Sequence, residues 1–176
     1  MAGKKQKLKY QAVLEEFLAA REWKDEIEID AETKSVKLAA GISIAGQDGR
    51  LFIEASDVTE YVDAFIYFEF RCRENKLDQM AILLNEIHRR WLFGRFTCFP
   101  DGVVRWTHRV DFENSSPTGL SIERIIKPGW DAAERFLEPI SAVALTKQSA
   151  KDAIAEFDEE QSKKEEKAEG DGPEEL

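Results

Sequence analysis

The chain has 176 residues, of which 43% are hydrophobic and 34% are charged, which is enough for one domain with a single hydrophobic core. Its formal net charge of -10 argues against sequence-independent binding to nucleic acids and to anionic membranes, because both depend on cationic side chains. The sequence has no run near the roughly 20 apolar residues that span a bilayer, no export signal and only two cysteines, so we expect a soluble cytoplasmic protein in a reducing compartment.

The negative charge is concentrated at the C-terminal end. Residues 151–176 contain eleven acidic and four basic residues, which gives -7 and leaves -3 for the first 150 residues. Beyond Asp158 the Glu/Lys/Gln-rich stretch lacks apolar residues that could join a core. We therefore expect a disordered acidic tail over 158–176 and a disordered basic N-terminus over 1–7. The folded domain, 8–157, is then close to neutral.

The N-terminal part begins with a helical pattern and continues with strands. Apolar residues over 8–21 recur every three or four positions, which predicts a first helix. Period-two alternation predicts a strand over 27–30, and a turn then leads to a second strand across 36–38. Residues 42–45 either prolong that strand or follow a bulge at Gly41, and the sequence leaves both alternatives open.

A hairpin and a long strand follow. The Asp-Gly pair within 47–50 is typical of a turn that needs positive φ, and it precedes a strand over 51–55. A second alternating segment over 62–72 is aromatic on both faces at its start, which indicates a central strand whose second face is partly covered by a helix or a second subunit. One face of that segment carries Ala64, Ile66, Phe68, Phe70 and Cys72, and the other carries Phe65, Tyr67, Glu69 and Arg71.

The C-terminal half contains a helix, a hairpin and further helices. Helical spacing predicts a helix over 77–91, and two strands over 92–99 and 103–112 flank a Pro-Asp-Gly turn. The remaining pattern predicts a short helix capped by Ser121, an interruption at Pro128-Gly129, a helix over 130–144 that Pro139 bends or breaks, and two more helical turns over 150–157.

These elements predict an α+β fold. Its antiparallel sheet is expected to have about five strands, with three main helices in the order α-β-β-β-α-β-β-α. The expected disordered segments, 1–7 and 158–176, flank this single domain.

Four segments carry a resemblance to a known family. They are Leu83-Leu84-Asn85-Glu86-Ile87, Phe93-Gly94-Arg95-Phe96, Asp101-Gly102-Val103-Val104 and the helix 130–140, in which Asn85 and Pro139 match family positions. Over roughly 8–145 the chain resembles the YbjN-like family of bacterial proteins, regulators of sensory transduction with a fold like that of type III secretion chaperones. The resemblance implies this fold and no catalytic residues. Such chaperones are acidic cytoplasmic homodimers that hold an extended client segment, so it also implies a homodimer.

The sequence contains no motif of a catalytic or metal site. Gly-x-Ser-x-Gly, P-loop and Gly-x-Gly-x-x-Gly motifs are absent, and the acidic pairs have no partner for general acid and base catalysis. His88 and His108 lack ligand spacing, so we interpret them as structural residues that could face each other across a helix and the sheet. Cys72 and Cys98 are expected to be buried thiols, either separate or adjacent. We expect no enzyme activity, no catalytic residue, no metal and no cofactor.

Basic residues cluster in the middle of this acidic chain, at Arg71, Arg73, Arg89, Arg90, Arg95, Arg105 and Arg109. One interpretation is ion pairing with neighbouring acids, namely Glu69, Glu74, Glu86 and Asp111. The other is a shallow cationic sheet face that accepts an acidic peptide, including the protein's own tail. Arginine and aromatic residues are enriched in interfaces. The predicted partner-binding residues are Arg71, Arg95, Arg105, Arg109, Phe65 and Tyr67.

The sequence therefore predicts a protein-binding module without catalysis. With the resemblance, it indicates a chaperone-like adaptor or a regulator of bacterial signalling that binds a protein or peptide partner on its sheet face, as a homodimer. We do not expect nucleic acid or membrane binding. The alternative is a small-molecule or nucleotide-sensing regulatory domain in which the arginine-rich face receives an anion.

Overall fold

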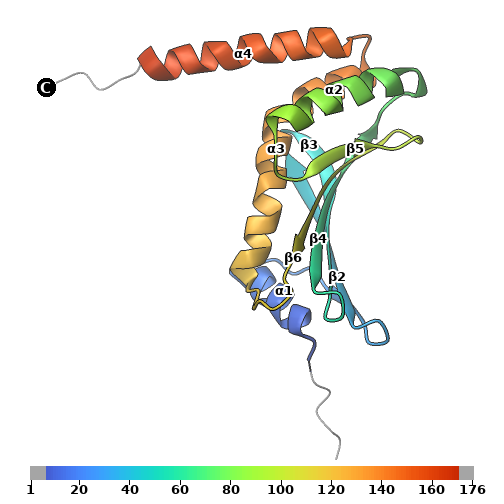
Figure 1. Cartoon of the computed structure of the whole chain (residues 1–176), viewed down its shortest axis with the longest axis vertical. Helices are drawn as coiled ribbons and strands as arrows, with labels where there is room; N and C mark the ends of the chain where they lie inside the picture. Colours follow the sequence, from blue (N-terminus) through green and yellow to red (C-terminus); the bar gives the residue numbers. More distant parts are fainter. Residues whose placement is uncertain (1–6, 171–176) are drawn as a thin grey trace, which may run out of the picture.

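The computed structural model of the chain describes residues 7–170 (Figure 1). The helices are α1 (Lys9–Ala20), α2 (Leu77–Arg90), α3 (Gly119–Leu145) and α4 (Ala150–Gly170), and a short 3-10 turn, η1 (Glu74–Lys76), precedes α2. The strands are β1 (Ile27–Asp30), β2 (Ser35–Ile44), β3 (Gln47–Ser56), β4 (Tyr61–Arg71), β5 (Arg95–Cys98) and β6 (Val103–Asp111). No helix within these residues is long and apolar enough to cross a bilayer.

All six strands form one antiparallel sheet in the order β1-β2-β3-β4-β6-β5. The α+β class and the antiparallel sheet are confirmed. The sheet has six strands, one more than the sequence predicted, because β1, β2, β3 and β4 all precede α2. The predicted order with three strands before that helix is therefore wrong by one strand.

The β2–β3 hairpin turns earlier than the sequence predicted. Its tip is Ala45-Gly46, both with positive φ (51° and 73°), as a two-residue hairpin turn requires. Residues 42–44 prolong β2 without a bulge, and Gly49 is paired inside the ladder. A Cβ on Gly49 would lie 2.6 Å from the Tyr67 carbonyl oxygen of β4, so glycine allows the close approach of the two strands there.

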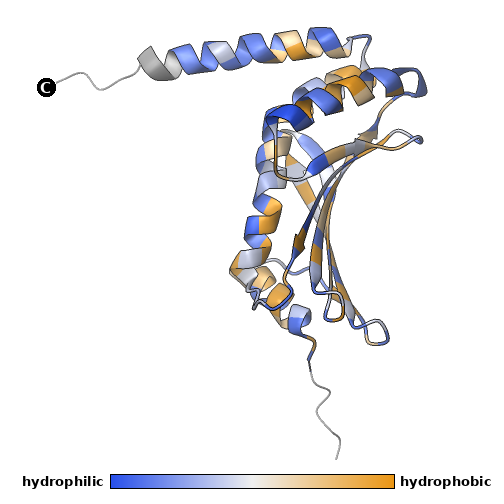
Figure 2. Ribbon diagram, viewed as in Figure 1, coloured by the Kyte–Doolittle hydropathy of each residue, from blue (hydrophilic) through white to orange (hydrophobic). Residues whose placement is uncertain are grey.

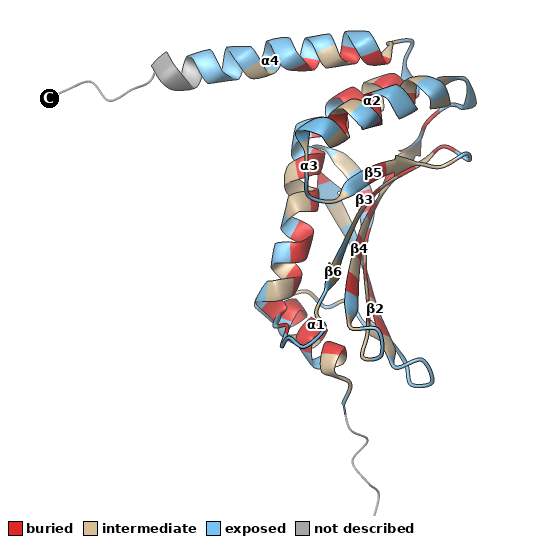
Figure 3. Ribbon diagram, viewed as in Figure 1, coloured by how far each residue is buried: buried red, intermediate tan, exposed pale blue. Residues whose placement is uncertain are grey.

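The hydrophobic core lies between the sheet and the helices α1 and α3, which cover one face (Figures 1 and 3). Alternate strand residues point toward these helices, and burial of each such side chain contributes about 1.5–3 kcal/mol. The same alternation directs the intervening residues to the opposite face, which no helix of the described chain covers and which is the concave side of the curved sheet in Figure 1. Fully buried core residues include Leu38, Leu51, Ile53, Val62, Ala64, Ile66, Trp106, Ile122 and Ile126.

Helix α3 is one helix of 27 residues, where the sequence predicted a break at Pro128-Gly129 and a bend or break at Pro139. Its N-cap is Thr118, and Ser121 completes a capping box at the third helical position, so Ser121 is not the cap itself. Each proline removes one backbone hydrogen bond, but the long buried stripe of α3 holds the helix together across both positions.

Helix α4 corrects the expectation of a disordered tail for residues 158–170. Ala150, Ala153 and Phe157 anchor its first turns on the core, and the Ser149 hydroxyl accepts a hydrogen bond from the Asp152 N–H at 3.2 Å. The following residues are strong helix formers, so the helix continues as a mainly hydrophilic rod that leads away from the sheet (Figures 1 and 2). Residues 7–170 thus form four α-helices instead of the three main helices expected. The disorder expected for 1–6 and 171–176 lies outside the described residues.

Candidate binding surface on the open face of the sheet

Strands β4, β5 and β6 place most of the predicted partner-binding residues on the uncovered face of the sheet. Tyr67 of β4 lies opposite Arg105 of β6, and Phe65 lies opposite Thr107. Thr107 in turn lies opposite Arg95 of β5. We call this surface the open face. It comprises Phe52, Asp63, Phe65, Tyr67, Arg95, Thr97, Phe99, Arg105, Thr107 and Arg109.

Arg105 lies at the centre of the open face among three aromatic rings. Its guanidinium carbon is 4.9 Å from the ring centroid of Phe65, 4.8 Å from that of Phe99 and 5.6 Å from that of Tyr67. Its Nη1 donates a hydrogen bond to the Tyr67 hydroxyl at 3.0 Å. No carboxylate of residues 7–170 forms an ion pair with it. Arg105 is therefore a pre-oriented cation whose charge is not neutralised within the described chain.

Arg109 and Arg71 differ from Arg105 because each binds a carboxylate of the same chain. Arg109 donates two hydrogen bonds to Asp63, at 2.7 and 2.8 Å, in a bidentate pair. Arg71 donates to the Asp101 carboxylate at 3.1 Å. The backbone N–H of Val103 and then Arg71 hold the pKa of Asp101 below its ordinary value. Both arginines offer less free charge to a partner than the sequence suggested.

Arg95 completes a shallow groove on the open face. This groove has a volume of about 390 Å³, and Arg95, Arg105 and Arg109 all line it. Arg95 forms no hydrogen bond or ion pair within residues 7–170 through its side chain. Arg71 lies outside the groove, at the end of β4, where it pairs with Val103 of β6. The structure therefore brings three of the four predicted arginines together, with Phe65 and Tyr67 beside them.

The loop between α2 and β5 adds two apolar side chains that sequence reasoning assigned differently. Leu92 is 85% exposed and Phe93 is 59% exposed, and both precede β5, where the sequence predicted a strand that begins at residue 92. The Trp91 indole N–H donates to the Phe93 carbonyl oxygen at 2.7 Å and fixes this loop. Leu92 also lines the arginine groove. The sequence signal for the exposure of these two side chains is Gly94. Its φ of 73° forms a left-handed turn that directs the preceding residues outward.

Glu86 is one of the four acids that the sequence offered as ion-pair partners of the arginine cluster, and it does form ion pairs. Glu86 accepts from Arg89 and Arg90 on α2, at three- and four-residue spacing. The acids that pair with Arg71 and Arg109 are Asp101 and Asp63, and not the neighbours that the sequence suggested.

His88 and His108 each have a separate backbone partner. His88 Nε2 accepts a hydrogen bond from the Phe96 N–H at 3.2 Å and thereby ties α2 to β5. His108 Nδ1–H donates to the Ile125 carbonyl oxygen of α3 at 3.1 Å. Burial, with a smaller effect of Arg95, lowers the pKa of His88. Among residues 7–170, no three side chains of His, Cys, Asp or Glu are arranged to hold a metal ion.

Acidification is expected to weaken the link between α2 and β5. Because the pKa of His88 is lower in the folded protein than in the unfolded chain, the unfolded chain binds a proton first as the pH falls below about 6.5. The contribution of neutral His88 is complete above this pH and declines below it. Urea unfolding between about pH 7.5 and pH 5 should show the stability difference between wild type and His88→Gln shrinking as the pH falls. A difference that stays constant with pH would contradict this assignment.

Cys72 and Cys98 are neighbouring free thiols at the ends of β4 and β5. Burial, followed by the interaction with Cys72, raises the pKa of Cys98 to about 12. Burial also raises the pKa of Cys72. Both thiols are thus protonated at neutral pH and pack as part of the core beneath the hairpin. The sequence left open whether the pair is adjacent, and the fold brings the two together.

Comparisons with known proteins give a family match over more than half of the chain. A family model named YbjN, described as "Putative bacterial sensory transduction regulator", matches residues 10–142. No curated protein matches the chain. Among solved structures, a chain of "Structure of the HopA1-SchA Chaperone-Effector Complex" is 12% identical with a TM-score of 0.46, and the match covers 70% of this chain and 93% of that one. The family match extends from α1 into α3 and includes the open face, whereas α4 lies beyond it.

Proposed function

Since the chain belongs to the YbjN family, we propose that it is a non-enzymatic regulator of bacterial signalling that works by binding a partner protein on its open face. The partner contributes an acidic segment that lies along the exposed side of β4, β6 and β5. The observation that carries this proposal is Arg105, a cation without an ion pair in residues 7–170 that is stacked among three aromatic rings. Aromatic and arginine side chains in such mixtures often supply most of the energy of an interface.

Charge and shape both favour an acidic occupant. Arg95 and Arg105 carry free positive charge at the groove, and Leu92 provides an apolar contact at its edge. An extended segment fits because its alternate side chains would meet the pleated surface at the spacing of the sheet. The protein's own tail is a poorer occupant, because α4 leads its described part away from the open face (Figure 1).

Two further features belong to this proposal. The chain acts in the cytoplasm, and it forms a homodimer, as the resemblance to secretion chaperones implies. Light scattering at micromolar concentration tests the second point. A strictly monomeric mass would contradict the proposed homodimer and would leave the proposed partner binding unaffected.

Capture of partners from native lysate tests the proposal. The full chain, a variant with Arg95→Glu and Arg105→Glu, and a control with Lys147→Glu and Lys151→Glu are compared under equal conditions. The control makes the same change in charge at two exposed lysines that do not line the groove. A partner retained by wild type and control but lost by the arginine variant, and then confirmed with purified proteins by calorimetry, supports the open face. Equal recovery by all three would overturn it.

A second candidate function is recognition of a small anion at the same groove. Three arginines from two adjacent strands line a volume of about 390 Å³, which is large enough for a phosphorylated metabolite. Thermal shift with nucleotides and phosphorylated metabolites distinguishes the two candidates. Stabilisation that disappears in the Arg95→Glu/Arg105→Glu variant favours the anion sensor, and no shift across the set favours the protein partner.

A further inference from the structure

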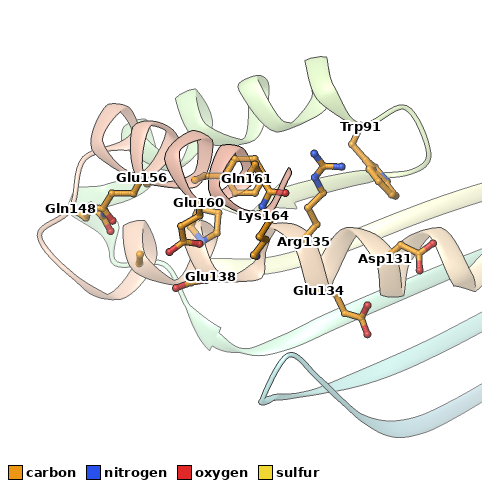
Figure 4. Close-up of a pocket in the computed structure, with 14 residues that line it drawn as sticks. Trp91, Asp131, Glu134, Arg135, Glu138, Gln148, Glu156, Glu160, Gln161 and Lys164 are labelled. Carbon is orange, nitrogen blue, oxygen red and sulfur yellow. The ribbon is translucent and has the colours of Figure 1, made fainter. Parts of the chain in front are cut away.

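A second groove lies on another side of the molecule, between α3 and α4. Helix α4 packs on the body only through its first turns and then diverges from α3 (Figure 1). The space between the two helices is a groove of about 550 Å³ (Figure 4). It shares no lining residue with the arginine groove on the open face.

The walls of this groove carry more acidic than basic side chains, because five carboxylates line it together with the cations Arg135 and Lys164. Glu134 and Glu138 project from α3, and Glu156 and Glu160 project from α4 (Figure 4). Each pair has four-residue spacing, which places two like charges on one side of a helix and costs a few tenths of a kcal/mol. None of the four forms an ion pair with a cation of residues 7–170, although the Gln148 amide donates to Glu156 at 2.6 Å. Stability of the isolated chain does not explain this arrangement.

The floor of the groove is apolar. Trp91, Pro139 and Phe157 line it, and the Phe157 ring packs on Phe136 with 5.3 Å between centroids. Arg135 lies over the Phe157 ring at 5.8 Å. An apolar floor between two helix walls with a net negative charge is complementary to an amphipathic helix with a basic polar side, which would pack as a third helix.

We propose that the groove between α3 and α4 binds a basic amphipathic helix of a partner protein. Lysine or arginine side chains of that helix pair with Glu138 and Glu160, and its apolar side packs on Trp91 and Phe157. This site is independent of the open face, so the protein would present two surfaces of opposite charge. The basic stretch Lys4-Lys5-Gln6-Lys7 of a second copy is the competing occupant, and it lacks the apolar side that the floor requires.

Fluorescence anisotropy with a labelled peptide tests this site. The probe is a lysine- and leucine-containing peptide of about 18 residues that forms an amphipathic helix, and the control peptide has the same composition in scrambled order. At roughly 50 mM salt, the full chain should bind the helical probe more tightly than the scrambled one. The pair Glu138→Lys/Glu160→Lys should weaken binding at least about tenfold. The milder pair Glu138→Gln/Glu160→Gln should weaken it in the same direction.

Matched variants separate the groove from general attraction to an acidic chain. Glu159→Lys/Glu166→Lys makes the same change in charge on α4 at positions that do not line the groove, and it should retain the wild-type affinity. The variant Arg95→Glu/Arg105→Glu should also retain the wild-type affinity for the probe. A failure of this proposal can therefore be told apart from a failure of the proposed partner binding on the open face. Equal weakening by both acidic pairs, or equal binding of the scrambled peptide, would overturn the proposal. A chain without residues 1–7 that binds the probe more tightly would instead assign the groove to a second copy.

Discussion

Replacing Gly129 by alanine is expected to destabilise the protein by about 1–3 kcal/mol, although glycine to alanine in a helix interior ordinarily stabilises by about 1 kcal/mol. The reason is the contact between α3 and the sheet. A Cβ on Gly129 would lie 2.6 Å from Cζ3 of Trp106 and 2.9 Å from Cδ1 of Ile66. Trp106 is fully buried in the core, where dense packing opposes its displacement. Packing at this point therefore reverses the usual effect of helix propensity.

Two further variants test whether the contact between Gly129 and Trp106 causes the loss of stability. Gly41→Ala is the control, because no heavy atom lies within 4 Å of the position that its methyl group would take and its φ is ordinary, so its effect should be small. In the Trp106→Phe background, Gly129→Ala should cost less than it does in the wild type, since the smaller ring leaves room for the methyl group. Urea unfolding followed by far-ultraviolet circular dichroism measures the stability of each chain. A Gly129→Ala protein that is more stable than the wild type would contradict the contact.

The sequence was sufficient wherever a local pattern decides the structure. The period-two alternation over 62–72 predicted both faces of β4, and the helical spacing over 77–91 predicted α2. The open face follows from the first pattern, because Phe65 and Tyr67 alternate with the core residues Ala64 and Ile66. Local periodicity is therefore enough to predict which face of β4 carries the candidate site.

Features that depend on contacts between distant segments could not be predicted in this way. The ion pair between Arg109 and Asp63 requires the register of β4 against β6, and the whole of α2 and β5 separates those strands in the sequence. The continuity of α3 across Pro128 depends on burial against Trp106. Residues beyond Asp158 lack the apolar side chains that would pack on a core, but many of them have a high helix propensity. Composition alone therefore predicted disorder where α4 continues as a helix.

Loss of the Arg105 side chain is expected to have the largest effect on partner binding. Arg105→Ala should weaken the affinity for the partner captured by the open face by roughly 30-fold or more, the range of an interface hot spot of about 2 kcal/mol. Arg95→Ala should have a smaller effect, since no aromatic ring of residues 7–170 lies within cation–π distance of Arg95. Arg71→Ala should change the affinity less than about threefold, because Asp101 already neutralises this exposed side chain.

Arg105→Lys separates the two properties that Arg105 combines. Lysine keeps the positive charge but has no planar guanidinium to stack on Phe65 and Phe99 while donating to the Tyr67 hydroxyl. If stacking orients the cation, Arg105→Lys binds the partner nearly as weakly as Arg105→Ala. Calorimetry with the purified partner measures the affinities, and urea unfolding of each variant checks that the sheet remains folded. Wild-type affinity in Arg105→Lys would show that charge alone suffices, and equal losses for Arg71→Ala and Arg105→Ala would place the contact outside the arginine groove.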